Sequence, residues 1–292
     1  MIPHQITAKT QLVGLIGWPV SHSVSPAMHN AAFAKLGLNW RYVPLPVPLD
    51  PAERIGEAVR GVRALGMKGC NVTVPHKQSV MPHLDALTQA AEAIGAVNTI
   101  IVQENGALLG DNTDAPGFVR DVKSHGVALA GKRALVLGAG GSSRAVVYGL
   151  AEAGCESIAI VNRTAEKAQE LAAAMQPYFP SCTVKNARLT EAAPHADFVV
   201  NCTSLGMTPK VDSTPWDEAI PFRKEQIVYD LVYNPRETRL MRKAAVDGAT
   251  AVGGLGMLVW QGAIALERWT GKSAPVETMA DACFAAMEKN SA

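Results

Sequence analysis

The sequence has almost no net charge and no long uninterrupted hydrophobic run. Its 27 basic residues nearly balance 26 acidic ones, which leaves a formal charge of +1. So small a charge attracts neither nucleic acid nor an anionic membrane, and we expect neither as a partner. The longest apolar stretch, residues 249–266, is interrupted by glycines and a glutamine. It is too short and too broken to span a bilayer.

Cysteine is scarce, and no pattern typical of a metal site is present. The five cysteines are scattered, without a Cys-x-x-Cys pair, and the seven histidines show no ligand spacing. A disulfide framework or a metal site is therefore not expected. Met1–Gln5 contains no basic stretch leading into a long apolar one, so we expect no secretory signal. A reducing, cytoplasmic location is the simplest expectation.

Length and composition suit a soluble globular protein. The chain has 292 residues, of which 48% are hydrophobic and 18% charged. A chain of this size buries a sizeable core and divides into two domains. No Gly-x-Ser-x-Gly nucleophile elbow occurs.

The clearest signal is a glycine-rich loop that follows a short apolar run. Ala134–Leu137 is typical of a buried strand, and the small residues of Gly138–Ser142 allow close approach to a pyrophosphate at the next helix N-terminus. We expect that helix at Ala145–Ala153, with Gly154 ending it. Ser143 replaces the third glycine of the usual pattern. A dinucleotide is predicted, although a plain turn or another ligand such as S-adenosylmethionine suits the same local fold.

A second apolar run ends in Val161-Asn162-Arg163-Thr164. An NAD site would place Asp or Glu near this point, on the ribose 2'-hydroxyl. Arginine would instead attract a 2'-phosphate, so the cofactor it suits is NADP. A solvated surface arginine is the plain alternative.

The loop lies well inside the chain, so we expect a substrate domain before it. The pattern predicts strands at 12–16, 40–45, 67–74 and 96–102, and helices at 26–36 and 84–94. Because strands and helices alternate, we expect parallel pairing. Asn105-Gly106 predicts a tight turn before Leu108, and further segments are expected as a helix at 118–124, a linker at 126–131, and strands at 198–201 and 227–231. The helical segment after Gly254 is expected to return to the first domain.

Two hydroxyl side chains lie at the start of the first predicted helix. We expect Ser25 as its N-cap and Pro26 at its first helical position. With Ser23 beside it, this N-terminus suits a substrate carboxylate. Capping alone is the alternative explanation.

A second polar group follows the predicted strand 67–74. Asn71, Thr73 and Lys77 are expected to project together at the strand end, where ligands bind in open α/β sheets. An ordinary exposed lysine is the alternative. In the polar stretch 110–114, Asp114 either joins this group or caps the next helix.

Together these segments resemble the shikimate dehydrogenase family over nearly the whole chain. The resemblance rests on Ser-x-Ser-Pro at Ser23, Asn-Val-Thr-x-Pro-x-Lys ending at Lys77, Ala96-Val97-Asn98-Thr99, Asn112-Thr113-Asp114, the nucleotide loop, Asn162-Arg163-Thr164, Tyr233-Asn234-Pro235 and the segment from Gly254 to Gln261. His76 and Ala115-Pro116 depart from familiar family residues, and we expect these departures to tune the pocket without touching a catalytic atom.

The resemblance implies an α/β fold of two domains. Residues 1–113 with 254–292 would bind substrate, and residues 114–253 would form a Rossmann-type doubly wound NADP domain. Lys77 and Asp114 would be the catalytic pair. The implied substrate residues are Ser23, Ser25, Thr73, Asn98, Asp114, Tyr233 and Gln261. The implied cofactor residues are Gly138, Ala139, Gly140, Gly141, Ser142, Asn162, Arg163, Thr164, Lys167, Thr203, Met207, Val232 and Gly254.

The implied reaction is the NADPH-dependent, reversible reduction of 3-dehydroshikimate to shikimate, a step of chorismate and aromatic amino acid biosynthesis. Lys77 would supply the proton, because an ammonium beside a carboxylate favours its charged form. Two alternatives stay open: a dual quinate/shikimate dehydrogenase that uses NAD or NADP, and a non-enzymatic NADP or metabolite sensor. We expect a monomer or a homodimer.

Overall fold

The computed structural model describes residues 6–291, and the chain within this range forms a mixed α/β fold of two compact units. Met1–Gln5, where no secretory signal is expected, lies outside the described residues. One unit comprises Met1–Gly117 with Val259–Ala292, and the other comprises Phe118–Leu258. Both divisions fall within helices. No helix in the described part of the chain is long and apolar enough to cross a membrane.

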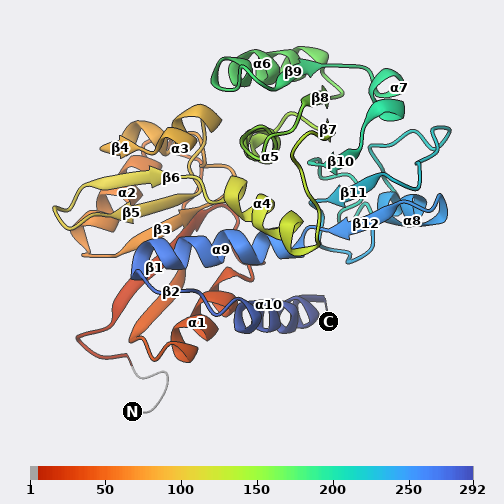
Figure 1. The fold of residues 1–292 in the computed structure, drawn as a ribbon. Coiled ribbons are helices and arrows are strands. Elements are labelled where there is room, and N and C mark those ends of the chain that lie inside the picture. The colour runs from red at the N-terminus through yellow and green to blue at the C-terminus, as the bar shows by residue number, and fades with distance from the viewer. Residues whose placement is uncertain (1–5, 292) are drawn as a thin grey trace. The chain divides into compact units, whose positions relative to one another are not determined.

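The first unit is built on a six-stranded mixed sheet. Its strands, in spatial order, are β2 (Trp40–Pro46), β1 (Gln11–Gly17), β3 (Gly69–Val72), β5 (Thr99–Val102), β6 (Leu108–Asp111) and β4 (Ala86–Leu87). Its helices are α1 (Ser25–Lys35), α2 (Arg54–Ala64), α3 (Gln89–Ile94), the first turn of α4 (Asp114–Ser124), most of α9 (Leu255–Thr270) and α10 (Val276–Ser291), with a short 3-10 turn at Met81–His83. Figure 1 shows α10 alongside α1, as the expected return of the C-terminal helices requires.

The expectation of parallel pairing is confirmed for only part of this sheet. β1 pairs in parallel with β2 and β3, whereas β5 is antiparallel to both β3 and β6. The Asn105-Gly106 turn, which is confirmed, explains the β5–β6 pair, because a tight turn joins only antiparallel strands. The expected helix at 84–94 is also shortened, since Ala86–Leu87 pairs with β6 and only Gln89–Ile94 is helical.

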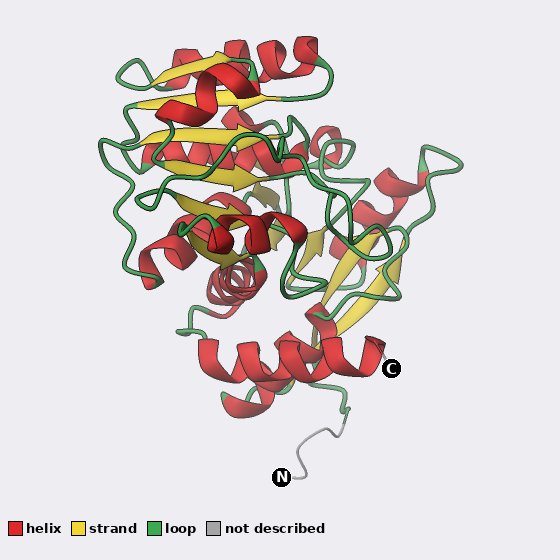
Figure 2. Ribbon diagram, turned by 90° about the vertical axis from the view of Figure 1, so that its right-hand side faces the viewer, coloured by secondary structure: helices red, strands yellow, loops and turns green. Residues whose placement is uncertain are grey.

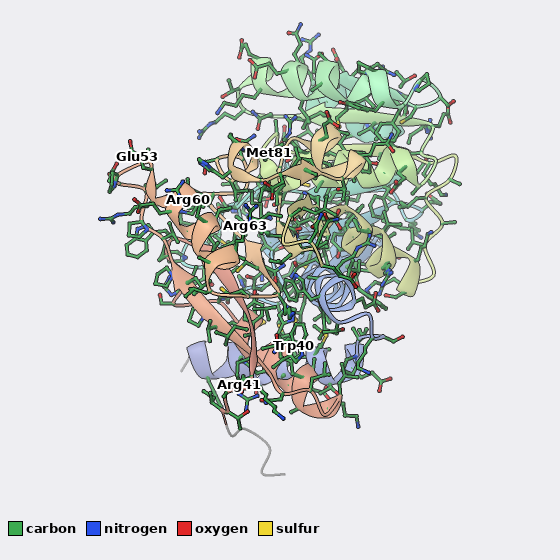
Figure 3. All side chains as sticks on the ribbon, turned by 90° about the vertical axis from the view of Figure 1, so that its left-hand side faces the viewer. Trp40, Arg41, Glu53, Arg60, Arg63 and Met81 are labelled. Atoms are coloured by element: carbon green, nitrogen blue, oxygen red, sulfur yellow. The ribbon has the colours of Figure 1, made fainter. Side chains whose placement is uncertain are left out.

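Helix α2 was not anticipated, although its sequence carries a helical signal. Ile55, Val59 and Val62 recur at helical spacing and are buried in the core of the first unit with residues of β3 and β5. Full burial of one such side chain contributes about 1.5–3 kcal/mol. Figure 3 labels Arg60 and Arg63 on this helix, and Arg63 pairs with Asp85.

Strand β2 forms one edge of the first sheet. Figure 3 labels Trp40 and Arg41 at its beginning. The strand also contains Pro44 and Pro46, both exposed, and it pairs with β1 along its whole length. Proline is tolerated in a sheet at an edge, where its missing N–H would face solvent.

The second unit is an all-parallel doubly wound sheet. The spatial order is β12 (Thr250–Gly253), β11 (Ile227–Asp230), β10 (Phe198–Asn201), β7 (Arg133–Leu137), β8 (Ser157–Val161) and β9 (Thr183–Asn186). This is the Rossmann order, which confirms that part of the prediction. Helices lie on both faces of the strands (Figure 2). They are α5 (Gly141–Glu152), α6 (Ala165–Met175), α7 (Leu189–Ala192), α8 (Arg239–Val246) and the remaining parts of α4 and α9, with 3-10 turns at Gln176–Tyr178 and Ala193–His195.

Candidate active site

Lys77 lies in the turn that follows β3, and its side chain contacts a carboxylate from another part of the first unit. Its Nζ donates a hydrogen bond to Asp114 Oδ2 at 2.6 Å. The Lys77 side chain is 19% exposed and that of Asp114 is 10% exposed. Lys77 is therefore not an ordinary solvated lysine, because its ammonium is held in one direction and keeps limited access to solvent.

Asp114 begins α4, but it does not cap the helix. Asn112 Oδ1 accepts hydrogen bonds from the N–H groups of Asp114 and Ala115, at 3.1 and 3.3 Å. The neighbouring asparagine thus takes over the capping role, which leaves the Asp114 carboxylate for Lys77 and Asn98. A carboxylate in the first turn of a helix is also favoured by the helix dipole.

Asn98 completes this arrangement from the segment just before β5. Its Nδ2 donates to Asp114 Oδ1 at 2.9 Å, and its Oδ1 accepts from the Thr113 N–H at 2.7 Å. Gln261 Oε1, on α9, lies 3.4 Å from the same Nδ2. The structure therefore brings together four of the residues singled out in the sequence: Lys77, Asn98, Asp114 and Gln261.

The serine pair at the start of α1 is arranged differently from the expectation. Ser25 is the first helical residue and Val24 occupies the N-cap without a side-chain cap, so Ser25 as N-cap is wrong by one position. Pro26 consequently takes the second helical position. Ser23 Oγ accepts from the Ser25 N–H at 3.2 Å, which satisfies one N–H that the helix start leaves without a backbone partner.

The other two implied substrate residues have different surroundings. Thr73 follows β3 and is half-buried, and its N–H donates to Ile16 O of β1. Tyr233 belongs to the second unit, in the segment after β11, where its side chain is 37% exposed.

The glycine loop of the second unit has the form needed for a pyrophosphate. Gly138 has φ of +109°, a conformation that L side chains rarely adopt. A Cβ added at Gly140 or Gly141 would meet open space, so the loop backbone is accessible. Helix α5 begins at Gly141, four residues before the expected Ala145. Its first N–H groups therefore belong to the loop itself and suit an anion.

Ser143 explains why this loop manages without a third glycine. Its side chain is fully buried, and its Oγ accepts a hydrogen bond from the Gly140 N–H at 3.1 Å. The hydroxyl thus ties the loop to the first turn of α5. Ala139 and Ser142, which flank Gly140 and Gly141, are half-buried.

The strand end carrying Arg163 is adjacent to this loop, because the Gly138 N–H donates to Val161 O at 2.7 Å. Asn162 Nδ2 donates to Thr164 O at 2.8 Å and shapes the turn into α6. Arg163 and Lys167 are both exposed. Two cations beside an accessible glycine loop fit a dinucleotide that carries an additional phosphate on its ribose.

The remaining implied cofactor residues lie at the ends of β10, β11 and β12. Thr203 donates through its hydroxyl to Asn201 Oδ1 at 2.7 Å, and the Val232 N–H donates to Asp230 Oδ1 at 3.0 Å. Met207 is 46% exposed. At Gly254 an added Cβ would lie 2.5 Å from Leu231 O, so only glycine fits there.

Sequence reasoning missed the residues that hold these loops. Asn201 and Asp230 are fully buried and joined by a 2.8 Å hydrogen bond from Asn201 Nδ2 to Asp230 Oδ1. Thr238 Oγ1 donates to the other carboxylate oxygen at 2.6 Å. The sequence signal for this pair is a polar residue at the end of each of two apolar strands, Asn201 of β10 and Asp230 of β11. Among the described residues no group of histidine, cysteine and acidic side chains is arranged to hold a metal ion.

Three family matches cover most of the chain. Residues 15–100 match the shikimate dehydrogenase substrate binding domain, residues 121–244 match shikimate / quinate 5-dehydrogenase, and residues 254–284 match the shikimate 5'-dehydrogenase C-terminal domain. The matches thus fall on both compact units.

Full-length relatives agree with these matches. The chain is 48% identical over 283 residues to the shikimate dehydrogenase (NADP(+)) of Moorella thermoacetica, with 94% of this chain and 93% of that protein covered. A crystal structure of a shikimate dehydrogenase in complex with NADP+ superposes with a TM-score of 0.91 at 39% identity, covering 97% of this chain and 98% of the other. The enzyme from Thermus thermophilus, in complex with NADP(H) and shikimate, gives 0.85 at 39% identity, with 94% and 99% covered. The chain belongs to the shikimate dehydrogenase family.

Proposed function

We propose that this protein is an NADP-dependent shikimate dehydrogenase, which reversibly reduces 3-dehydroshikimate to shikimate. The observation that carries the proposal is the 2.6 Å contact between Lys77 Nζ and Asp114 Oδ2, held on its other side by Asn98. A sensor that only binds its ligand has no need of a proton donor fixed in this way. NADPH, when bound, supplies the hydride.

Lys77 is the proton donor in the direction of reduction. Its Nζ carries three protons, of which one is directed at Asp114 Oδ2. The others are available to the oxygen of the substrate carbonyl, which develops negative charge during reduction and accepts a proton. In the direction of oxidation the lysine must first lose a proton, so oxidation is expected to favour higher pH.

Asp114 fixes the direction of the Lys77 ammonium, because the two groups form a short charge-assisted hydrogen bond. Because Asn112 relieves Asp114 of capping the helix, both carboxylate oxygens serve the site.

Hydroxyl and amide groups of the first unit suit a hydroxylated cyclic acid. We assign the substrate carboxylate to Ser23 and Ser25 and the ring hydroxyls to Thr73, Asn98, Asp114 and Gln261, with Tyr233 as a further contact. A substrate that lacks one of these hydroxyls would leave a polar group of the site without a partner, and this is the source of discrimination.

The second unit fits NADP. We assign the pyrophosphate to Gly138–Ser142 and the 2'-phosphate to Arg163 and Lys167, with Asn162 and Thr164 shaping that end. Thr203, Met207, Val232 and Gly254 are assigned to the nicotinamide. The open backbone at Gly140 and Gly141 and the exposed cations support this assignment.

The remaining assignments are coarser. Substrate binding belongs to residues 1–113 with 254–292, and NADP binding to residues 114–253. We propose a cytoplasmic enzyme, monomeric or homodimeric, that acts on a small molecule and binds neither nucleic acid nor membrane.

The test is turnover by the purified protein. NADPH absorbance is followed with 3-dehydroshikimate, and NADP+ and NAD+ reduction is then followed with shikimate and with quinate. We expect rapid turnover with 3-dehydroshikimate, and NADP+ preferred over NAD+. Faster turnover of quinate than of shikimate would show that quinate is the preferred substrate. Binding of NADPH without turnover of any substrate would favour a sensor.

A further inference from the structure

A chain of buried hydrogen bonds continues from Asn98 away from Lys77. Thr99, the first residue of β5, is fully buried, and its Oγ1 donates to Asn98 Oδ1 at 3.0 Å. Asn71 Nδ2 donates to Thr99 Oγ1 at 3.0 Å, and Tyr42 Oη donates to Asn71 Oδ1 at 2.9 Å. Asn71 is thus engaged within the first unit. The register of the sheet sets this order, because Asn71 lies opposite Thr99.

The direction of these hydrogen bonds at Asn98 is fixed by chemistry. The backbone N–H of Thr113 can only donate, so it must face Asn98 Oδ1, and the Asp114 carboxylate can only accept, so it must face Asn98 Nδ2. Thr99 Oγ1 receives a proton from Asn71 and lies 3.0 Å from Asn98 Oδ1 and 3.2 Å from Thr113 Oγ1. Its own proton is therefore directed at Asn98 or at the Thr113 hydroxyl, which itself bonds to Asn98 Oδ1. The side chains therefore donate in one direction, from Tyr42 toward Asp114.

Aromatic packing holds Tyr42, which lies at the end of this series of hydrogen bonds farthest from Lys77. The ring of His29 stacks on Tyr42 with centroids 4.3 Å apart and an interplanar angle of 1°, and Trp269 contacts both rings. Burial lowers the pKa of His29 to about 3, so this imidazole is neutral. Burial also raises the pKa of the Tyr42 phenol well above its ordinary value, with smaller effects from Cys70 in the same direction and Ser25 in the opposite one. Tyr42 thus remains a hydrogen-bond donor.

We propose that Thr99 and Tyr42 are positioning residues for the reaction: through Asn98 they hold the Asp114 carboxylate, and with it Lys77, in its working direction. The inference rests on the proposed function and deepens it. Thr99 and Tyr42 are not assigned a contact with substrate or cofactor; they act by limiting the rotation of one amide.

Loss of the Thr99 hydroxyl has two consequences. Asn71 Nδ2 loses one of its two acceptors, and Asn98 Oδ1 keeps only its contacts with Thr113. The contacts with Thr113 still keep the Asn98 side chain in the site, so we expect substrate binding to change less than turnover. Misdirection of the carboxylate mainly slows the proton transfer, for which geometry is demanding.

The test compares Thr99→Val, which has nearly the same shape but no hydroxyl, with Thr99→Ser, which keeps the hydroxyl. For Thr99→Val we expect kcat to fall about tenfold and KM for shikimate to rise less than about threefold. Thr99→Ser is expected to recover most of kcat. Thr270→Val is the matched control, since the Thr270 hydroxyl donates to Leu266 O, accepts from the Lys272 N–H and has no contact with the hydrogen bonds that lead to Asn98. The kcat of this variant should equal that of the wild type.

Tyr42→Phe provides a second test if Thr99→Val fails to fold. It keeps the ring stacked on His29 and removes the hydroxyl, which donates to Asn71 and also interacts with Ser25. We expect kcat to fall about threefold. Folded variants with wild-type kcat would overturn the inference, as would equal losses in Thr99→Val and Thr99→Ser. If the wild type itself fails to turn over, the proposed function falls and this inference with it. A wild type that turns over alongside unaffected variants overturns the inference alone.

Discussion

The two units each contain a buried pair of asparagine and aspartate, and the pairs differ in their remaining partners. Asn98 donates to Asp114 at 2.9 Å in the first unit, and Asn201 donates to Asp230 at 2.8 Å in the second. The other oxygen of Asp114 faces the ammonium of Lys77. The other oxygen of Asp230 accepts from the hydroxyl of Thr238.

This difference shows how similar local chemistry serves two purposes. Asp230 has only neutral donors among its hydrogen-bond partners and is fully buried, so it fixes the segments that follow β10 and β11. Asp114 holds a cation that keeps some access to solvent, and a cation with three protons can give one away. The remaining partner of each carboxylate, rather than the carboxylate–amide pair, distinguishes the site proposed for proton transfer from the structural one.

The largest effect is expected when the partner that distinguishes Asp114 is removed. Lys77→Ala should lower kcat by about 10²- to 10⁴-fold with a smaller change in KM, because a general acid is lost while most substrate contacts remain. Steady-state oxidation of NADPH with 3-dehydroshikimate measures both constants. Lys68→Ala, which removes an exposed lysine of the same unit, is the control. An unchanged kcat in Lys77→Ala would show that Lys77 takes no part in the mechanism. Asp114 would then have a structural role like that of Asp230.

A substitution in the second unit should weaken cofactor binding and leave the proton transfer unchanged. Arg163→Ala is expected to raise KM for NADP+ about 10- to 100-fold, since a hydrogen bond to a charged group contributes about 1.5–3 kcal/mol. KM for NAD+ should stay the same, because NAD+ has no 2'-phosphate. Arg188→Ala, an exposed arginine paired with Glu191, is the control. Equal effects on both cofactors would show that Arg163 acts on the fold rather than on the phosphate.

The smallest effect is expected at the structural carboxylate. Asp230→Asn should lower the free energy of unfolding by about 1 kcal/mol at low pH, because the amide reproduces only part of the hydrogen bonding. Denaturant unfolding of both proteins measures the difference. Asp212→Asn, an exposed position of the same unit, is the control.

The pH dependence of that difference has a definite sign. Burial raises the pKa of Asp230 above 3.8, while the hydrogen bonds from Thr238, Val232 and Asn201 lower it by less. The folded state therefore binds the proton more tightly than the unfolded state. The resulting stabilisation is present below pH 3.8 and is lost as pH rises through the raised pKa. The advantage of the wild type over Asp230→Asn should shrink as pH rises, and a growing advantage would contradict this assignment.

Features set by neighbouring residues were the ones that the sequence predicted well. The strand, the glycine loop and the Arg163 turn depend on local backbone requirements, such as the positive φ of Gly138. The helix boundaries were less certain, because capping depends on single residues. Asn112 rather than Asp114 caps α4, and Val24 rather than Ser25 precedes α1.

The arrangements that were missed depend on contacts between distant segments. Tyr42 of β2 reaches Thr99 only through Asn71, once β2, β1, β3 and β5 are paired. Asn201 meets Asp230 between the neighbouring strands β10 and β11. A buried polar residue at a strand end indicates that some partner exists, but the sequence does not say which one. The antiparallel pairing of β5 with β3 was missed for the same reason.

The two prolines of β2 affect how this protein meets other molecules. On an edge strand the N–H groups that face outward can pair with a strand of another chain, which is a common beginning of aggregation. Pro44 and Pro46 are two residues apart, so they face the same way and remove successive donors from the outer edge. A second chain therefore cannot extend the sheet past this part of β2. If the enzyme is a homodimer, its interface does not form by extension of the sheet at this part of β2.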